Sequence, residues 1–141
     1  MATIFSRIIA GELPARFVWQ DERCVAFLAN RPLQPGHTLV VPRAEVDHWL
    51  DLEPELLAHL AGVAQVLGRA LQRGFHPAKV GMMLAGLEVP HVHIHLVPIT
   101  SERDLDFANQ DIHPTDEALD AAAETIRRCL ADRTASKPAP Q

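Results

Sequence analysis

Histidines alternate strictly with apolar residues in one short segment of this chain, His91-Val92-His93-Ile94-His95-Leu96-Val97. Successive side chains of a β-strand point to opposite faces, so in a strand the three histidines share one face and the apolar residues between them share the other. We expect the apolar residues to pack into a core and the imidazoles to lie about 6 to 7 Å apart on the opposite face. Imidazole titrates near neutral pH and can act as a nucleophile, an acid or a hydrogen-bond donor. This face is therefore the candidate catalytic site.

Two other interpretations of the three histidines remain open on the pattern alone. Each could be an ordinary surface histidine on a half-exposed strand, although the strict alternation of three disfavours it. They could also bind a metal ion, because imidazole is a common zinc ligand and catalytic zinc is often held by three histidines.

The rest of the sequence predicts short strands and three helices. A short helix over residues 4–10 can be capped by Thr3, a long amphipathic helix over 54–73 ends at Gly74, and a last helix starts near Thr115. Strands are expected at 16–20, 24–28, 37–42, 79–85 and 89–99. This order predicts an α+β fold, in which an antiparallel sheet of about five strands carries the long helix, the C-terminal helix and the short helix on one face.

Composition limits the class of protein. A chain of 141 residues, 48% of them hydrophobic, can form one core, so we expect a single domain over residues 1–133 and a flexible C-terminal tail at 134–141. The net charge of −5 argues against binding of a polynucleotide. No apolar N-terminal segment and no run of about eighteen apolar residues occurs, which predicts a cytoplasmic protein that does not enter a membrane. Cys24 and Cys129 are far apart and are expected to be reduced thiols.

The segment 91–97 resembles the signature of the histidine triad (HIT) family, in which three histidines alternate with apolar residues and two apolar residues end the motif. The resemblance covers residues 2–98 and is to the Hint branch of the family. It rests on Thr3-Ile4-Phe5 with Ile8-Ile9, Glu12-Leu13-Pro14, Asp21-Glu22-Arg23-Cys24-Val25-Ala26-Phe27 and His37-Thr38-Leu39-Val40-Val41-Pro42. It implies a HIT-like fold and a hydrolase or transferase that acts on the α-phosphorus of nucleoside phosphoramidates or related nucleotide conjugates.

The resemblance also implies roles for four histidines. His93 is the nucleophile and forms a covalent nucleotidyl-histidine that water resolves. His95 donates to the phosphate and helps to protonate the leaving group, His91 supports its neighbours and the phosphate, and His37 corresponds to the family's fourth active-site histidine. A neutral imidazole nitrogen attacks phosphorus well, and neighbouring donors stabilise charge on the phosphoryl oxygens, so neither a metal nor a cofactor is expected.

The expected partners also follow from the resemblance. A purine nucleotide or nucleotide conjugate would lie against the residues that match the nucleotide-binding positions, although such residues are often plain core. These residues are Ile4, Phe5, Ile8, Phe27, Leu28, Asn30 and Val89. The family usually forms homodimers, here through the helix at 54–73 and the strand at 79–85. Two alternatives stay open: a dinucleoside polyphosphate hydrolase, and a catalytically weak module that binds a nucleotide or a partner protein.

The sequence departs from the family pattern at the expected binding site. Ala29 occupies the position of an aspartate that holds the ribose hydroxyls, and Asn30 is either a substitute for it or a turn residue. Leu87 stands where a glutamine is usual, and Glu88 brings a negative charge near the phosphate. These changes weaken electrostatic stabilisation. They indicate slow turnover, an unusual leaving group or a substrate other than an adenosine nucleotide.

Overall fold

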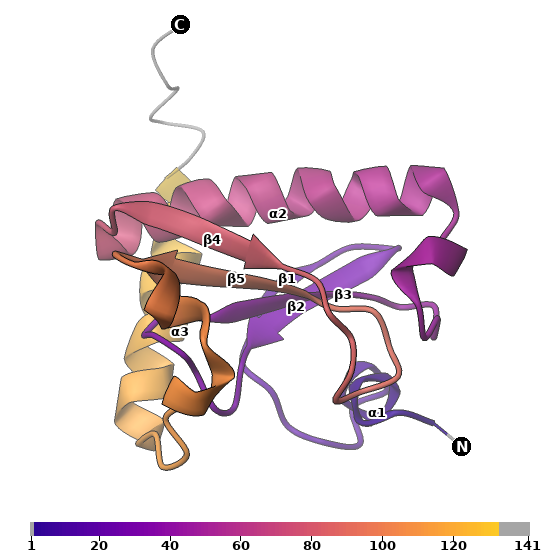
Figure 1. Ribbon diagram of the computed structural model, residues 1–141, viewed down its shortest axis with the longest axis horizontal. Helices are drawn as coiled ribbons and strands as arrows, with labels where there is room; N and C mark the ends of the chain where they lie inside the picture. The colour runs from indigo at the N-terminus through magenta and orange to yellow at the C-terminus, as the bar shows by residue number, and fades with distance from the viewer. Residues whose placement is uncertain (1, 133–141) are drawn as a thin grey trace, which may run out of the picture.

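The computed structural model describes residues 2–132 (Figure 1). Its main elements are α1 (Ile4–Ile9), β1 (Phe17–Gln20), β2 (Cys24–Leu28), β3 (Thr38–Pro42), α2 (Pro54–Phe75), β4 (Lys79–Met83), β5 (Ile94–Ile99) and α3 (Asp116–Asp132). Three short 3-10 helices are η1 (Trp49–Asp51), η2 (Glu102–Leu105) and η3 (Phe107–Asn109). The expected tail at 134–141 and the end of the expected domain at Arg133 lie outside the described residues. No helix within the described part of the chain is long and apolar enough to cross a membrane.

The five strands form one antiparallel sheet in the order β1-β2-β3-β5-β4. Figure 1 shows α2 running along the sheet with α3 packed near one end of it, while α1 lies away from both. The α+β fold, the sheet of about five strands, the long helix and the C-terminal helix are therefore confirmed.

Both faces of the sheet bury apolar side chains. One face packs against α2 and α3, which contribute Leu60, Leu67 and Ile126 to its core. The opposite face packs against α1 through Phe5 and Ile8. Every residue of β2 and β3 is buried, so these strands need cover on both sides. The expectation that all helices lie on one face is therefore wrong for α1.

The histidine-rich strand begins later than its alternating pattern predicts. Regular pairing starts at Ile94 rather than at residue 89, and β4 ends at Met83 rather than at 85. Pro90 has no N–H to give to a ladder, and the N–H of Val92 binds the carbonyl of Val46 in a different segment. Residues 84–93 therefore form a loop, which we call the 84–93 loop. Only the last of the three histidines lies within β5.

The long helix also continues past its predicted end. Gly74 is not its terminus, because α2 runs to Phe75 and ends at His76, whose φ of 52° is left-handed. Gly74 instead permits the close approach of α3, since a Cβ atom there would lie 2.7 Å from Cγ2 of Thr125. The glycine is explained by packing between helices rather than by termination.

Candidate functional site

Four histidines lie in a buried cluster. The exposed fractions of His37, His91, His93 and His95 are 2%, 0%, 4% and 7%. This burial rules out the interpretation of the triad as ordinary surface histidines. The ring centroids of His93 and His95 are 4.8 Å apart, closer than the expected 6 to 7 Å, and the rings meet edge-on with 65° between their planes. The apolar residues between them are buried in the core on the other side, as predicted.

His91 is turned away from the other imidazoles and toward the start of α1. Its Nε2 lies 2.8 Å from the carbonyl oxygen of Pro42, and its Nδ1 lies 2.8 Å from Oγ1 of Thr3. A carbonyl can only accept, so Nε2 carries the proton and Nδ1 accepts from the threonine hydroxyl. Thr3 is held in place because its Oγ1 also accepts from the N–H of Ser6 and caps α1. Both ring nitrogens of His91 are therefore already engaged within the protein.

His93 is held in one tautomer by the backbone of His91. Its Nδ1 lies 2.7 Å from the His91 carbonyl oxygen, so Nδ1 carries the proton and Nε2 keeps a free lone pair. Burial lowers the pKa of His93, and the hydrogen bond to the His91 backbone opposes part of this shift. The neutral ring with an available Nε2 is the form that can attack an electrophile.

A chain of hydrogen bonds fixes the tautomer of His95. The backbone N–H of Leu33 donates to Nδ1 of His37 over 3.0 Å, so His37 carries its proton on Nε2. That nitrogen lies 2.9 Å from Nδ1 of His95, which must then accept. The proton of His95 is consequently on Nε2, where it can be donated to a bound group. Burial, followed by the charges of neighbouring histidines, lowers the pKa of His37 to about 3 and that of His95 to about 4.

Two cavities meet at His93 and His95. The first, which we call the α1 cavity, has a volume of about 360 Å³ and lies between α1, β2 and the 84–93 loop. Its lining includes every residue that the resemblance matched to nucleotide binding, namely Ile4, Phe5, Ile8, Phe27, Leu28, Asn30 and Val89. His37, His93 and His95 also line it, whereas His91 does not.

The second cavity, which we call the loop cavity, has a volume of about 180 Å³. Its lining comprises Ala85, Gly86, Leu87, Glu88, His93, His95 and Phe107. Glu88, like His93 and His95, lines both cavities. The two histidines with an available ring nitrogen therefore face two adjoining hollows.

Several lining residues were missed by the sequence interpretation. Phe107 lies with its ring centroid 5.1 Å from that of His95, and Gln110 lines the α1 cavity. Both belong to the polar segment after β5, which has no regular apolar period. The sequence signal that could have predicted turns in this segment is its aspartates, which often accept hydrogen bonds from nearby backbone N–H groups. The carboxylate of Asp104 accepts from two backbone N–H groups, and the carboxylate of Asp106 accepts from one. These turns fold the segment back over the histidines.

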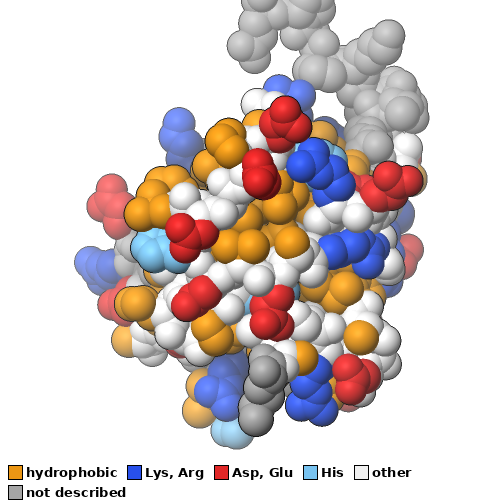
Figure 2. Space-filling model, turned by 90° about the vertical axis from the view of Figure 1, so that its right-hand side faces the viewer, with side chains coloured by type: hydrophobic (Ala, Val, Ile, Leu, Met, Phe, Trp, Pro, Cys, Tyr) orange, Lys and Arg blue, Asp and Glu red, His pale blue; other side chains and the backbone are white. Residues whose placement is uncertain are grey.

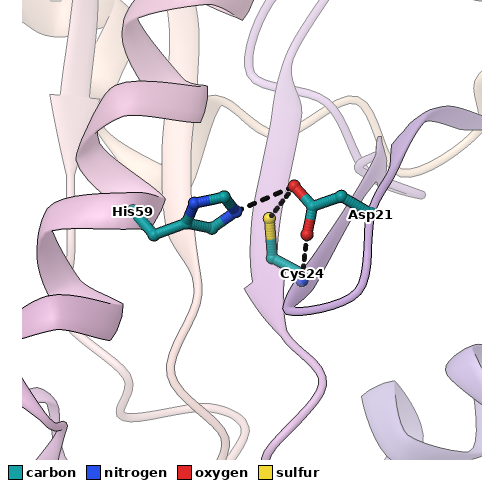
Figure 3. A group of neighbouring side chains, drawn as sticks. All are labelled: Asp21, Cys24 and His59. Carbon is teal, nitrogen blue, oxygen red and sulfur yellow. Dashed lines mark hydrogen bonds and ion pairs between the residues drawn. The ribbon is translucent and has the colours of Figure 1, made fainter.

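A second group of reactive side chains lies away from the two cavities. Figure 3 shows the carboxylate of Asp21 in contact with both Cys24 and His59. Its Oδ2 lies 2.8 Å from Nε2 of His59 and 3.5 Å from the Cys24 thiol. Burial and the charge of Asp21 raise the pKa of the Cys24 thiol to about 12, so it is a poor nucleophile. One atom of each residue that could bind a metal ion lies within 4.8 Å of the other two. A metal ion would have to displace hydrogen bonds that already satisfy Asp21, and the group is explained as a link between the β1–β2 turn and α2.

The buried histidines predict a pH-dependent stability. Because the pKa values of His37, His93 and His95 are lowered in the folded protein, the unfolded chain binds more protons below pH 6.5. Their contribution to stability is fully present above about pH 6.5 and is lost as the pH falls through the lowered pKa values, which are about 4 for His95 and about 3 for His37. We expect the free energy of unfolding to fall between about pH 7 and pH 5 by up to about 1.4 kcal/mol per pH unit for each histidine.

Urea unfolding at several pH values measures this slope. His37→Gln should reduce it, whereas His113→Gln, at an exposed histidine, should leave it unchanged. A stability that does not vary over this range would contradict the neutral, buried state of the cluster.

Comparison with known proteins places the chain in a family. The model of the HIT domain matches residues 10–102. An uncharacterised HIT-like protein of Mycobacterium tuberculosis is 33% identical, over 96% of this chain and 98% of the relative. An adenylylsulfatase of Arabidopsis thaliana is 25% identical, over 98% of this chain and 72% of the relative. The crystal structure of a zinc-bound histidine triad protein from Mycobacterium smegmatis superposes with a TM-score of 0.82 at 29% identity, covering 96% of this chain and 97% of the other. The chain belongs to the HIT family, a family of nucleotide-binding hydrolases and transferases.

Proposed function

We propose that this protein cleaves the bond between the α-phosphorus of a nucleotide and its leaving group, with a nucleoside 5′-phosphoramidate or a related conjugate as substrate. The observation that carries the proposal is the free lone pair on Nε2 of His93 at the junction of two cavities. An N–H donor of His95 lies beside it. A nucleophile next to a donor is the arrangement that phosphoryl transfer requires.

The reaction proceeds in two balanced steps. Nε2 of His93 attacks phosphorus, and the bond to the leaving nitrogen breaks with its electron pair moving to that nitrogen. The leaving nitrogen takes a proton from the solvent rather than from His95 as the resemblance implies, because the neutral ring of His95 carries its only proton on Nε2 and would become an imidazolate if it gave it up. The amine departs neutral, the N–H of His95 stabilises a phosphoryl oxygen, and the hydroxide left in the solvent is neutralised by the proton released in the second step. Water then attacks the nucleotidyl-histidine, the phosphorus–Nε2 bond returns its electron pair to His93, and a proton passes to the solvent.

The α1 cavity is the proposed site of the nucleoside. Its apolar walls from α1 and β2 suit the faces of a purine base, and Asn30 is placed at the same cavity to contact the ribose in the absence of an aspartate at Ala29. His91 acts in this proposal as a positioning residue, because it contacts the site through its backbone carbonyl. The proposed reaction uses no metal or cofactor, and we propose that the protein acts in the cytoplasm with a Hint-like specificity.

Release of nucleoside monophosphate from adenosine and guanosine 5′-phosphoramidates tests this function. We expect multiple turnovers with at least one of them. A protein that binds nucleotide in calorimetry but hydrolyses neither phosphoramidates nor dinucleoside polyphosphates would be a binding module instead. The departures at Ala29 and Leu87 favour that second candidate, because both remove polar contacts expected around the nucleotide.

We further propose that two copies of the chain pair through α2 and β4. β4 is an edge strand, and Met82 on it is 62% exposed. Beside it a groove of about 700 Å³ lies between β4 and α2. An open edge strand can pair with the same strand of a second copy across a two-fold axis.

Substitution of Met82 tests the dimer. Met82→Glu should convert a dimer into a monomer, because it places two carboxylates at a self-complementary contact. Ile112→Glu, which adds the same charge at another exposed apolar residue, should leave the dimer intact. Sedimentation velocity measures both variants, and a monomeric wild-type protein would contradict the pairing.

A further inference from the structure

The loop cavity has a distinctive chemical lining. Ala85 and Phe107 contribute apolar surface to it, together with Leu87, which is 93% exposed, and Glu88 is its acidic residue. Among the residues that the structure describes, no Lys or Arg lines it. Figure 2 shows one end of the molecule, where acidic, basic and hydrophobic side chains are interspersed. A group that enters this cavity therefore meets apolar surface and negative charge.

The position of the loop cavity indicates which part of a substrate would occupy it. Once a nucleoside fills the α1 cavity, the loop cavity is the adjoining hollow that also reaches His93 and His95. The group attached to the other side of the phosphorus must extend into it. Burial is the largest effect on the pKa of His93 and lowers it, while the negative charge of Glu88 acts in the opposite direction with the smallest effect. Glu88 shares the lining of both cavities with His93, so its charge lies near the reacting ring.

We propose that the loop cavity selects the leaving group, and that Glu88 makes it prefer amines that carry a second, positive charge on an apolar chain. Anionic leaving groups such as sulfate or a polyphosphate meet the negative charge of Glu88 in the loop cavity, whose lining includes no Lys or Arg, whereas Arg31 lines the adjoining α1 cavity. This inference rests on the proposed function and adds the chemical class of the departing group. It also distinguishes the phosphoramidate substrate from the dinucleoside polyphosphate alternative.

The size of the effect is limited by solvent. Glu88 is exposed, and an ion pair that water screens contributes a factor of about fivefold at most. The preference should also weaken as the ionic strength rises. We therefore expect about a fivefold advantage of a cationic leaving group over a neutral one, and a comparable disadvantage of an anionic one.

Three adenosine 5′-phosphoramidates that differ only at the far end of the amine provide the test. Their amines are putrescine, butylamine and γ-aminobutyrate, which are cationic, neutral and anionic beyond the same type of phosphorus–nitrogen bond. The kcat/KM values of wild type should follow that order, and Glu88→Gln should bring the three values together. Glu22→Gln, at an exposed carboxylate outside both cavities, should keep the wild-type order.

The outcomes separate this inference from the proposed function. Turnover of all three compounds at equal kcat/KM, or an order that survives Glu88→Gln, would overturn the leaving-group preference alone. An equal fall in kcat/KM for all three compounds in Glu88→Gln would also overturn it. The carboxylate would then act on the adenosine phosphoramidate group that they share and not on the end of the amine. No turnover of any of them would overturn both proposals.

Discussion

His93→Ala is expected to lower kcat for a phosphoramidate by at least about 10³-fold. The substitution removes the Nε2 lone pair that the His91 carbonyl holds available at the junction of the two cavities. The other three histidines cannot replace it. Both ring nitrogens of His91 are already hydrogen-bonded within the protein. His37 and His95 are hydrogen-bonded to each other, and that bond occupies the lone pair on Nδ1 of His95. Release of nucleoside monophosphate under saturating substrate measures the loss.

A folding control separates chemistry from structure in this experiment. His93→Ala should still bind a nucleoside monophosphate in calorimetry, because most of the α1 cavity is formed by other residues. His113→Ala changes an exposed histidine outside both cavities and should retain wild-type turnover. A well-folded His93→Ala protein with near wild-type kcat would show that another group attacks the substrate.

His95→Ala should have the next largest effect, a loss of about 10² to 10³-fold in kcat. This is the size expected when a single preorganised donor to the phosphoryl oxygens is removed. His37→Ala should lose less, because it acts only by keeping the proton of His95 on Nε2. His37 is therefore a positioning residue.

A double-mutant cycle tests this dependence. The double variant with His37→Ala and His95→Ala should be no slower than His95→Ala alone, since the effect of His37 passes through His95. Additive losses would mean that His37 contacts the substrate directly. Urea unfolding of each variant checks that the removal of a buried ring has not unfolded the protein.

The sequence predicted the sheet and helices well because their signals are local. The alternation around His93 correctly placed Val92 and Ile94 in the core, and the helical spacing after Pro54 correctly predicted α2. The predicted start of β5 at residue 89 was wrong, because the N–H of Val92 donates to the carbonyl of Val46 in a distant segment instead of to a neighbouring strand. The role of Gly74 depends in the same way on the approach of α3.

The candidate site was predictable in its residues but not in its connections. Family resemblance named four histidines and seven pocket residues, and the structure brings all of them except the His91 ring to the α1 cavity. The tautomers could not be predicted, because they depend on partners far away in the chain, Thr3 for His91 and His37 for His95. Phe107 was missed because an aromatic residue in an irregular polar segment has no periodic signal.

The proposed mechanism requires a covalent bond between His93 and the nucleotide. Rapid acid quenching of wild-type protein with adenosine 5′-phosphoramidate, followed by mass spectrometry of its peptides, detects this bond. We expect an added adenylyl group on the peptide that contains His93, at a position that fragmentation assigns to that residue, and no such adduct in His93→Ala. Turnover with no adduct at early times, or an adduct that persists in His93→Ala, would contradict the account.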